Sequence, residues 1–233
     1  MSRLEKASNS LRQFTSNASH QMRTPLAVAR VHLDVLDRYG PTSPQGKAAL
    51  QDIPHAIDTL EMLLKQLIAL ARSEDQGDMQ LRPFDLADLA ASITGDRAAQ
   101  APASMDIGYD NQAHGAIMAL GQPSLAGELL GNLLDNAIRY SDPNGTVLVS
   151  VWREDGQAMV EIDDNGPGIA EEHRAKVWDR FYRIAARSDA PGTGLGLPIA
   201  RALADRLGAT IELLDGRTGN GLCVLVRFRL APA

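Results

Sequence analysis

The chain has 233 residues, 44% of them hydrophobic, so it can bury one or two cores, and no apolar run approaches the roughly 18 residues of a membrane-spanning helix. Its net charge of −6, from 23 basic and 29 acidic residues, argues against non-specific nucleic-acid binding, which needs a basic face. The polar N-terminus lacks a secretory signal and the lone Cys223 excludes a disulfide framework, so we expect a cytoplasmic chain with Cys223 in a core strand.

The chain up to about residue 73 has helical periodicity, interrupted once by the breaker-rich stretch YGPTSPQG at residues 39–46. This pattern predicts a helical hairpin. At 100° per residue, His20 and Thr24 lie one turn apart on the side of the first helix opposite its apolar stripe. The stripe spans an arc of roughly 80°. It consists of Ala18, Met22, Leu26, Ala29, Leu33 and Leu36.

Pro25 lies inside the first predicted helix, five residues after His20. A proline has no backbone N–H, so the carbonyl of Gln21 loses its helical partner, and we predict a kink beside His20. Pro54 has two interpretations, a similar kink or the first turn of the second helix.

The second predicted helix has apolar residues at alternating steps of four and three, the spacing of a helix-bundle seam. The seam contains Ile53, Ile57, Leu60, Leu64, Leu67 and Ala71, and a flanking row contains Ala56, Leu63 and Leu70. Two helices have too little interior to cover so broad a stripe. We therefore predict that two hairpins pair into a dimeric four-helix bundle, which a monomer at micromolar concentration would contradict.

From about residue 82 onward, alternating β-branched runs such as GTVLVSVW and CVLVRFRL interleave with helical segments, which predicts an α/β layer fold. We expect a hairpin domain at 1–73, a linker at 74–83 and an α/β domain at 84–233.

Three polar motifs in the second domain indicate a ligand. In GELLGNLLDNAIRYS, Asn132, Asn136 and Arg139 fall within about 60° of one helical face, opposite the leucines. Asparagine has low helix propensity, so two of them in mid-helix suggest that they bind a hydrated cation or its phosphate, although a solvated face is the alternative. In DDNGPGI, Gly166 and Gly168 permit a close backbone approach, or form only a turn.

The third motif, GTGLGLPIARALADRLG, is a glycine-rich turn that opens a helix, whose first amides can face a phosphate. A loop rather than a strand precedes it, which argues against a dinucleotide-binding Rossmann motif. The GKS or GKT of a phosphate-loop ATPase is absent from the sequence. A nucleotide must therefore be held in another way.

Taken together, five stretches resemble, in order, the H, N, G1, F and G2 boxes of the bacterial sensor histidine kinases of two-component systems. These stretches are FTSNASHQMRTPLA, NLLDNAIRYS, DDNGPGI, WDRFYR and GTGLGLPIA. The likeness covers the chain from about residue 10 to 230. It implies a dimerisation and histidine-phosphotransfer hairpin followed by an α/β-sandwich ATP-binding domain of the gyrase and Hsp90 type. It also implies a response regulator as partner, with any membrane anchor upstream of this chain.

The resemblance also assigns roles to residues. It makes His20 the phosphoacceptor, Asn136 the Mg²⁺ ligand and Asp164 the carboxylate that accepts from the adenine amino group of ATP. The other residues that it assigns to nucleotide binding are Asn132, Arg139, Tyr140, Gly166, Gly168, Arg183, Arg187, Gly192, Thr193, Gly194, Leu195, Gly196 and Leu197. Arg183 and Arg187 belong to a short ATP lid, and Thr24 matches the position that orients water for dephosphorylating the regulator.

Gln21 departs from the family pattern, because the family usually has Glu or Asp directly after the phosphoacceptor. An amide can orient the imidazole but cannot take its proton, and general-base help is typically worth about 10²–10⁴-fold. We expect a slower autokinase. The serious alternative is a catalytically weak, phosphatase-dominant or scaffold relative, whereas a gyrase-like or Hsp90-like ATPase would have no reason to contain the His20 hairpin.

Overall fold

The computed structural model describes residues 3–74, 80–184, 193–217 and 219–232, and the chain divides into two compact units at residues 1–68 and 69–233. Half of the predicted linker at 74–83 lies outside the described residues, because 75–79 are not among them. Within the described ranges, no helix is both long and apolar enough to cross a membrane.

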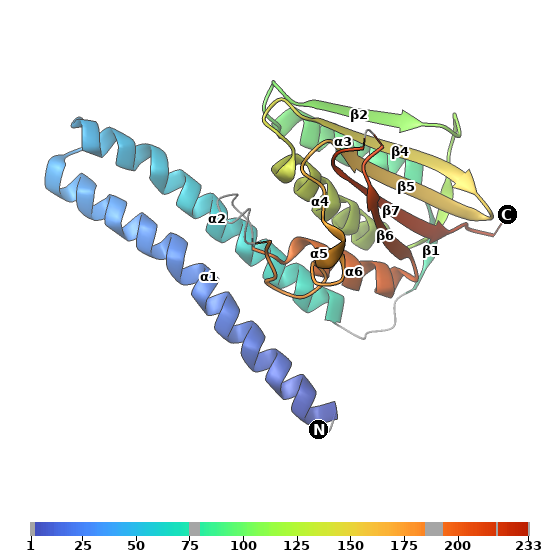
Figure 1. Ribbon diagram of the computed structural model, residues 1–233, viewed down its shortest axis with the longest axis horizontal. Coiled ribbons are helices and arrows are strands. Elements are labelled where there is room, and N and C mark those ends of the chain that lie inside the picture. The colour runs from blue at the N-terminus through green and yellow to red at the C-terminus, as the bar shows by residue number, and fades with distance from the viewer. Residues whose placement is uncertain (1–2, 75–79, 185–192, 218, 233) are drawn as a thin grey trace. The chain divides into compact units, whose positions relative to one another are not determined.

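The first unit is a helical hairpin, as predicted. Helix α1 (Arg3–Tyr39) is followed by a four-residue turn and by α2 (Pro44–Glu74), which extends beyond the first unit. Figure 1 shows the two long helices joined by this short connection.

The hairpin turn follows from the capping chemistry of its residues. Gly40 has φ +72°, the left-handed conformation that ends many helices, and its N–H donates to the Leu36 carbonyl at 2.9 Å. Ser43 caps the next helix: its Oγ accepts the Gly46 N–H at 2.9 Å and donates to the Gly40 carbonyl at 2.9 Å. Pro44, which has no N–H to lose, occupies the first helical position.

One face of α2 is buried. Ala49, Ala56 and Leu63, spaced seven residues apart, are each less than a tenth exposed. Asp52 lies within about 60° of Ala49 and Ala56 around the helix, and its Oδ2 lies 3.5 Å from Nε2 of His32 on α1. This face therefore points toward α1, and Ala56 and Leu63 of the row predicted to flank the seam are buried.

The predicted seam is different, because several of its large apolar side chains are exposed. Ile57 and Leu64 on α2 are 46% and 52% exposed, and Leu26 and Leu33 on α1 are both 56% exposed. Among the described residues, nine of the ten exposed large hydrophobic side chains belong to the first unit. A single hairpin thus leaves an apolar face exposed to water, which is energetically unfavourable.

Both internal prolines are accommodated within continuous helices. α1 runs through Pro25, and α2 runs through Pro54, which lies ten residues after the first residue of that helix. Pro54 is therefore not in a first turn. The bend beside His20 stays a prediction.

The second unit is an α/β sandwich. Its five-stranded sheet has the order β2-β4-β5-β7-β6, in which β2 and β4 are parallel and the other neighbours are antiparallel. Strands β1 and β3 form a separate antiparallel pair. In chain order the elements are β1 (Arg82–Asp85), α3 (Leu86–Gln100), β2 (Asp106–Asn111), β3 (Met118–Gly121), α4 (Pro123–Tyr140), β4 (Thr146–Glu154), β5 (Gln157–Asp164), α5 (Glu171–Arg174), α6 (Gly196–Leu207), β6 (Thr210–Asp215) and β7 (Leu222–Arg229).

Helices α3, α4 and α6 lie on one face of this sheet (Figure 1), and the core is between the two layers. Successive side chains of a strand point to opposite faces of the sheet. Residues paired on neighbouring strands point to the same face, as do Val149 on β4, Ile162 on β5 and Val224 on β7. On the helical side, Leu129, Leu133 and Leu134 of α4 are fully buried. The predicted α/β fold is confirmed.

Cys223 lies in β7 and is 2% exposed, which confirms the prediction of a small core residue in a strand. Burial, followed by the nearby charge of Glu161, raises the pKa of this thiol to about 12. The thiol is therefore protonated and unreactive near neutral pH.

Candidate functional site

The second unit contains a cleft of about 930 Å³, including its open mouth, formed by α4, the segment after β5 and the beginning of α6. Ten of the residues predicted to bind a nucleotide line it. They are Asn136, Arg139, Tyr140, Asp164, Gly168, Arg183, Thr193, Gly194, Gly196 and Leu197. The structure thus brings together residues from four of the five motifs.

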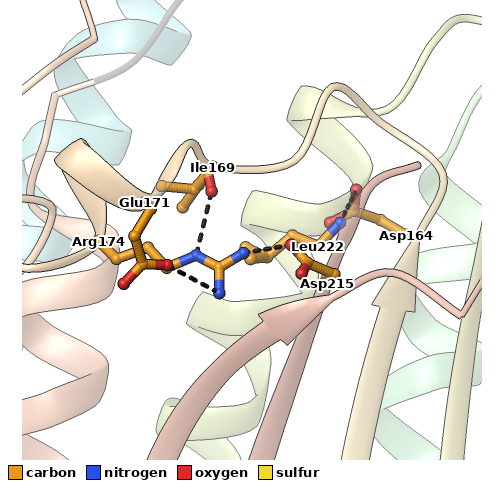
Figure 2. A network of polar contacts seen from close by, with 6 residues as sticks. All are labelled: Asp164, Ile169, Glu171, Arg174, Asp215 and Leu222. Atoms are coloured by element: carbon orange, nitrogen blue, oxygen red, sulfur yellow. Dashed lines mark hydrogen bonds and ion pairs between the residues drawn. The ribbon is translucent and has the colours of Figure 1, made fainter. Parts of the chain in front are cut away.

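Asp164 forms one end of the cleft. It is the last residue of β5 and is 6% exposed, and its Oδ1 accepts the N–H of Gly166 at 2.9 Å and of Leu222 at 3.3 Å. Figure 2 shows the bond from Leu222, the first residue of β7. Two backbone donors from different segments therefore fix the orientation of this carboxylate.

A close backbone approach makes this arrangement possible. Gly221, which precedes Leu222, has φ +95°, and a Cβ built there would overlap the Asp164 carbonyl oxygen. Only glycine fits this position. Gly221 therefore lets the backbone come close enough for the Leu222 N–H to reach the Asp164 carboxylate.

The wall beside Asp164 is apolar. Ile169 and Val177 come from the segment after β5, Leu222 and Val224 come from β7, and Ala137 comes from α4. A buried carboxylate only accepts hydrogen bonds, so this end of the cleft suits a flat apolar ring that carries a donor.

The other end of the cleft is polar and lies at the beginning of α6. No side chain caps this helix at Leu195, and Gly196 and Leu197, its first two residues, line the cleft. The backbone N–H groups of a first helical turn have no partner within the helix, so they are available to a ligand. Arg139 and Arg183 line the same cleft. Helix amides together with arginines form a site for phosphate groups.

Asn136 on α4 lies against the first residue of α6. A Cβ built on Gly196 would lie 2.6 Å from both Oδ1 and Nδ2 of Asn136, so the glycine leaves the room that this amide occupies. The Asn136 amide is thereby held beside the beginning of α6, and an amide oxygen is a suitable ligand for a hard cation.

Phe181 and Gly194, described residues on either side of the predicted lid segment, lie together. Phe181 donates its N–H to the Gly194 carbonyl at 2.9 Å, and the Tyr182 hydroxyl lies 2.8 Å from Nδ1 of His173 on α5. The segment between Phe181 and Gly194 includes residues 185–192, which the structure does not describe. The predicted lid residues Arg187 and Gly192 therefore lie outside the described residues.

Three other predicted residues do not line the cleft. Asn132 donates from Nδ2 to the carbonyl of Glu128 at 2.8 Å, one turn back on its own helix. Gly166 is buried beneath Asp164, and Leu195 is a fully buried core residue whose N–H donates to Thr193 Oγ1 at 3.2 Å.

The candidate phosphoacceptor belongs to the other unit. His20 and Thr24 are both exposed on α1, and Gln21 is half-buried. An exposed imidazole is accessible to a second protein, in contrast to a nucleotide in a cleft.

Sequence reasoning missed ten lining residues. They are Leu133, Ala137, Pro167, Ile169, Val177, Tyr182, Ile184, Pro198, Leu222 and Val224. Helical periodicity placed Leu133 and Ala137 on the face of α4 opposite Asn136, so it did not mark them as lining residues. Nothing in the sequence marks Leu222 and Val224, because the sheet order alone brings β7 beside β5.

Comparison with known families defines the class of each part of the chain. Residues 121–232 match the model of the histidine kinase-, DNA gyrase B- and HSP90-like ATPase family, and residues 10–76 match the His Kinase A (phospho-acceptor) domain. The cleft thus lies in an ATPase-family domain, and His20 lies in a phosphoacceptor domain. The chain belongs to the sensor histidine kinases.

Individual relatives agree. The sensor protein kinase PmrB of Pseudomonas aeruginosa is 33% identical over 228 residues, which cover 97% of this chain and 47% of PmrB. The sensor protein QseC of Escherichia coli K12 is 35% identical over 90% of this chain and 46% of its own length. The chain therefore spans about half the length of these curated relatives.

Solved structures share the fold. The histidine kinase AdeS of Acinetobacter baumannii matches with a TM-score of 0.68 and 22% identity, over 91% of this chain and 98% of its own. The histidine kinase ThkA, solved in complex with the response regulator protein TrrA, matches with a TM-score of 0.77 and 17% identity, over 99% of this chain and 65% of its own. At such identities the likeness concerns the fold alone.

The contact between Asn136 and Gly196 can be tested with Gly196→Ala. The added methyl group forces the Asn136 amide to move, so we expect affinity for a magnesium–adenine nucleotide to fall about tenfold, the effect of one lost interaction of roughly 1.4 kcal/mol. The free energy of unfolding should change by less than about 1 kcal/mol, because alanine restricts the unfolded chain. Titration calorimetry and urea unfolding measure the two effects.

Gly95→Ala on α3 is the matched control, since a Cβ built at Gly95 meets no atom within 4 Å. It should raise stability by about 0.5–1 kcal/mol and leave nucleotide affinity unchanged. Equal nucleotide affinity in Gly196→Ala and Gly95→Ala would contradict the prediction that nucleotide binding depends on the position of the Asn136 amide.

Proposed function

We propose that this chain is an ATP-dependent protein-histidine kinase that transfers the γ-phosphoryl group of ATP to His20 and then to an aspartate in the receiver domain of a response regulator. The observation that carries the proposal is the cleft with Asp164 at one end and the opening amides of α6 at the other, in a chain that also presents an exposed His20. ThkA, solved with a response regulator, supports the choice of partner. ATP and such regulators are cytoplasmic, so we place this chain there, with any membrane anchor upstream.

The two ends of the cleft suit the two ends of ATP. The Asp164 carboxylate accepts a hydrogen bond from the adenine amino group, and the apolar wall at Ile169 and Leu222 covers the faces of the ring. The amides of Gly196 and Leu197 and the guanidinium of Arg183 meet the phosphates, where they stabilise the charge that develops during transfer. Arg187 and Tyr140 complete this proposed set.

The residues at the phosphate end also fit Mg²⁺. Asn136 offers an amide oxygen that is held in place by its packing against Gly196, and Asn132 lies one turn away on the same helix. A cation held by the Asn136 amide would supply positive charge that neutralises the phosphates. We therefore propose Asn136 as the magnesium ligand, and Thr193, Gly194 and Leu195 as the turn that positions α6 beside it.

His20 supplies the nucleophile. A ring nitrogen of its neutral imidazole forms a bond to the γ-phosphorus while the bond to the β,γ-bridging oxygen breaks, ADP leaves, and the imidazole proton passes to solvent. The resulting phosphorus–nitrogen bond is labile enough to pass the phosphoryl group to a carboxylate. Exposure of His20 on α1 lets a regulator reach it.

The first test is incubation of the purified chain with γ-labelled Mg-ATP, alongside His20→Ala. We expect acid-labile label on the wild-type chain and none on the variant, because the acceptor nitrogen is gone. Label that survives acid, or equal labelling of His20→Ala, would contradict the proposal.

Gln21 supports a slow reaction, since an amide orients the imidazole but cannot accept its proton. We expect Gln21→Glu to raise the autophosphorylation rate by about tenfold or more, toward the 10²–10⁴-fold that general-base catalysis typically supplies. Initial rates at saturating ATP measure this effect, and Gln21→Asn, which keeps the amide, is the control. An unchanged rate in Gln21→Glu would show that proton removal does not limit the step.

Gln21 also supports a second candidate function, a phosphatase-dominant or scaffold protein with weak kinase activity. Thr24, exposed one turn after His20, is placed to orient a water molecule on a phosphorylated regulator. Thr24→Ala should lower regulator dephosphorylation about tenfold or more and spare autophosphorylation, whereas Thr24→Ser should keep both. Equal loss of both activities would refute this role.

We also propose that two chains pair through the hairpin, because Ile57, Leu64 and Leu26 present apolar surface that a partner hairpin would bury. Sedimentation velocity at micromolar concentration should show a dimer, and Leu64→Asp should shift it to monomer, because it places a charge in the seam. Met118→Asp is the matched control, since Met118 is an exposed hydrophobic residue of the second unit. A wild-type monomer would contradict the pairing.

A further inference from the structure

We propose that Arg174 on α5 is a positioning residue for the base end of the nucleotide cleft, which it holds together without lining the cleft itself. The inference rests on the proposed function, since it assumes that an adenine nucleotide occupies the cleft.

Arg174 joins three acceptors (Figure 2). Its Nε donates to the Ile169 carbonyl at 3.1 Å, its Nη1 lies 3.4 Å from Oε2 of Glu171, and its Nη2 pairs with Oδ1 of Asp215. The Arg174 side chain is 23% exposed, so it is largely withdrawn from water. A planar guanidinium can satisfy several acceptors at once, which lysine cannot do in this geometry.

These acceptors belong to two different walls of the cleft. Ile169 lines the cleft directly. Asp215 ends β6, and its partner in the β6–β7 register is Leu222, which lines the cleft and donates its N–H to Asp164. Arg174 thus ties the loop after β5 to the strand pair that orients the Asp164 carboxylate.

The tied segment has little regular structure of its own. α5 contains four residues and has no side-chain N-cap, and the stretch between Asp164 and α5 contains no further helix or strand. Its attachment to β6 therefore depends on side chains such as Arg174. Loosening it lowers the fraction of molecules with a complete base site and raises the apparent dissociation constant in proportion.

The expected signature follows from the position of these contacts. The base end is common to ATP and ADP, so both should bind more weakly by the same factor when Arg174 is replaced. The phosphate end at Asn136 and Gly196 is unchanged, so the rate at saturating ATP should be unchanged as well. A merely unstable variant would instead lose maximal rate and keep its half-saturating ATP concentration.

The experiment compares Arg174→Gln and Asp215→Asn with the wild-type chain. We expect Mg-ADP to bind about tenfold more weakly to Arg174→Gln, which loses charge-assisted contacts to two walls. We expect about a threefold loss in Asp215→Asn, because the Asp215 side chain is 81% exposed and such pairs are screened by water. The half-saturating ATP concentration for autophosphorylation should rise by the same factors, and Asp215→Glu should restore the wild-type values.

Arg227→Gln is the matched control. It removes the ion pair between Nη2 of Arg227 on β7 and Oε2 of Glu212 on β6, which are 2.7 Å apart. Neither residue lines the cleft. Nucleotide affinity should not change in this variant.

Three outcomes would overturn the positioning role. The first is that Arg174→Gln and Asp215→Asn bind ADP as tightly as the wild-type chain does. The second is that these variants lose maximal rate while their half-saturating ATP concentration is unchanged. The third is that Arg227→Gln loses as much ADP affinity as Arg174→Gln. A wild-type chain that binds ADP but acquires no label on His20 refutes only the kinase proposal, and the ADP titrations still decide the case of Arg174. Failure of the wild-type chain to bind any adenine nucleotide would refute both.

Discussion

The hydrogen bonds that Asp164 accepts from Gly166 and Leu222 are the interaction on which the cleft depends. A buried carboxylate is costly unless donors satisfy it, and here the donors come from two segments on either side of it. The carboxylate therefore joins the end of β5 to the beginning of β7 and faces the cleft in one orientation. Gly221 permits this junction through its left-handed backbone, and Arg174 ties the adjoining loop to β6.

The proposed chemistry is divided between two units with opposite requirements. A nucleotide needs a cleft that excludes water around its ring and concentrates donors at its phosphates, and the α/β sandwich supplies it between α4 and α6. A phosphoryl group that passes to a second protein needs an exposed carrier, and His20 on α1 is exposed. The hairpin also exposes Ile57 and Leu64, so the helix pair that presents His20 is the part of the chain with apolar surface left to bury.

Local chemistry made most of the fold and part of the site predictable. The hairpin turn was predicted from the breaker-rich stretch at residues 39–46, and the structure shows that Gly40, Ser43 and Pro44 of this stretch cap the two helices. Asp164 was assigned through the resemblance of DDNGPGI to a family motif. Leu222 could not be found, since it lies 58 residues from Asp164 in sequence and meets it only through the sheet order. Periodicity gave two apolar rows on α2 but could not say which one α1 covers.

The most direct measurement of the central claim is the affinity of the wild-type chain for ADP and for inosine diphosphate, with Asp164→Asn measured beside it. Inosine has an oxygen where adenine has its amino donor, so it leaves the Asp164 carboxylate facing an acceptor. The account predicts that inosine diphosphate binds at least about tenfold more weakly than ADP, and that Asp164→Asn loses most of this discrimination. Equal affinities for the two nucleotides in the wild-type chain would contradict it.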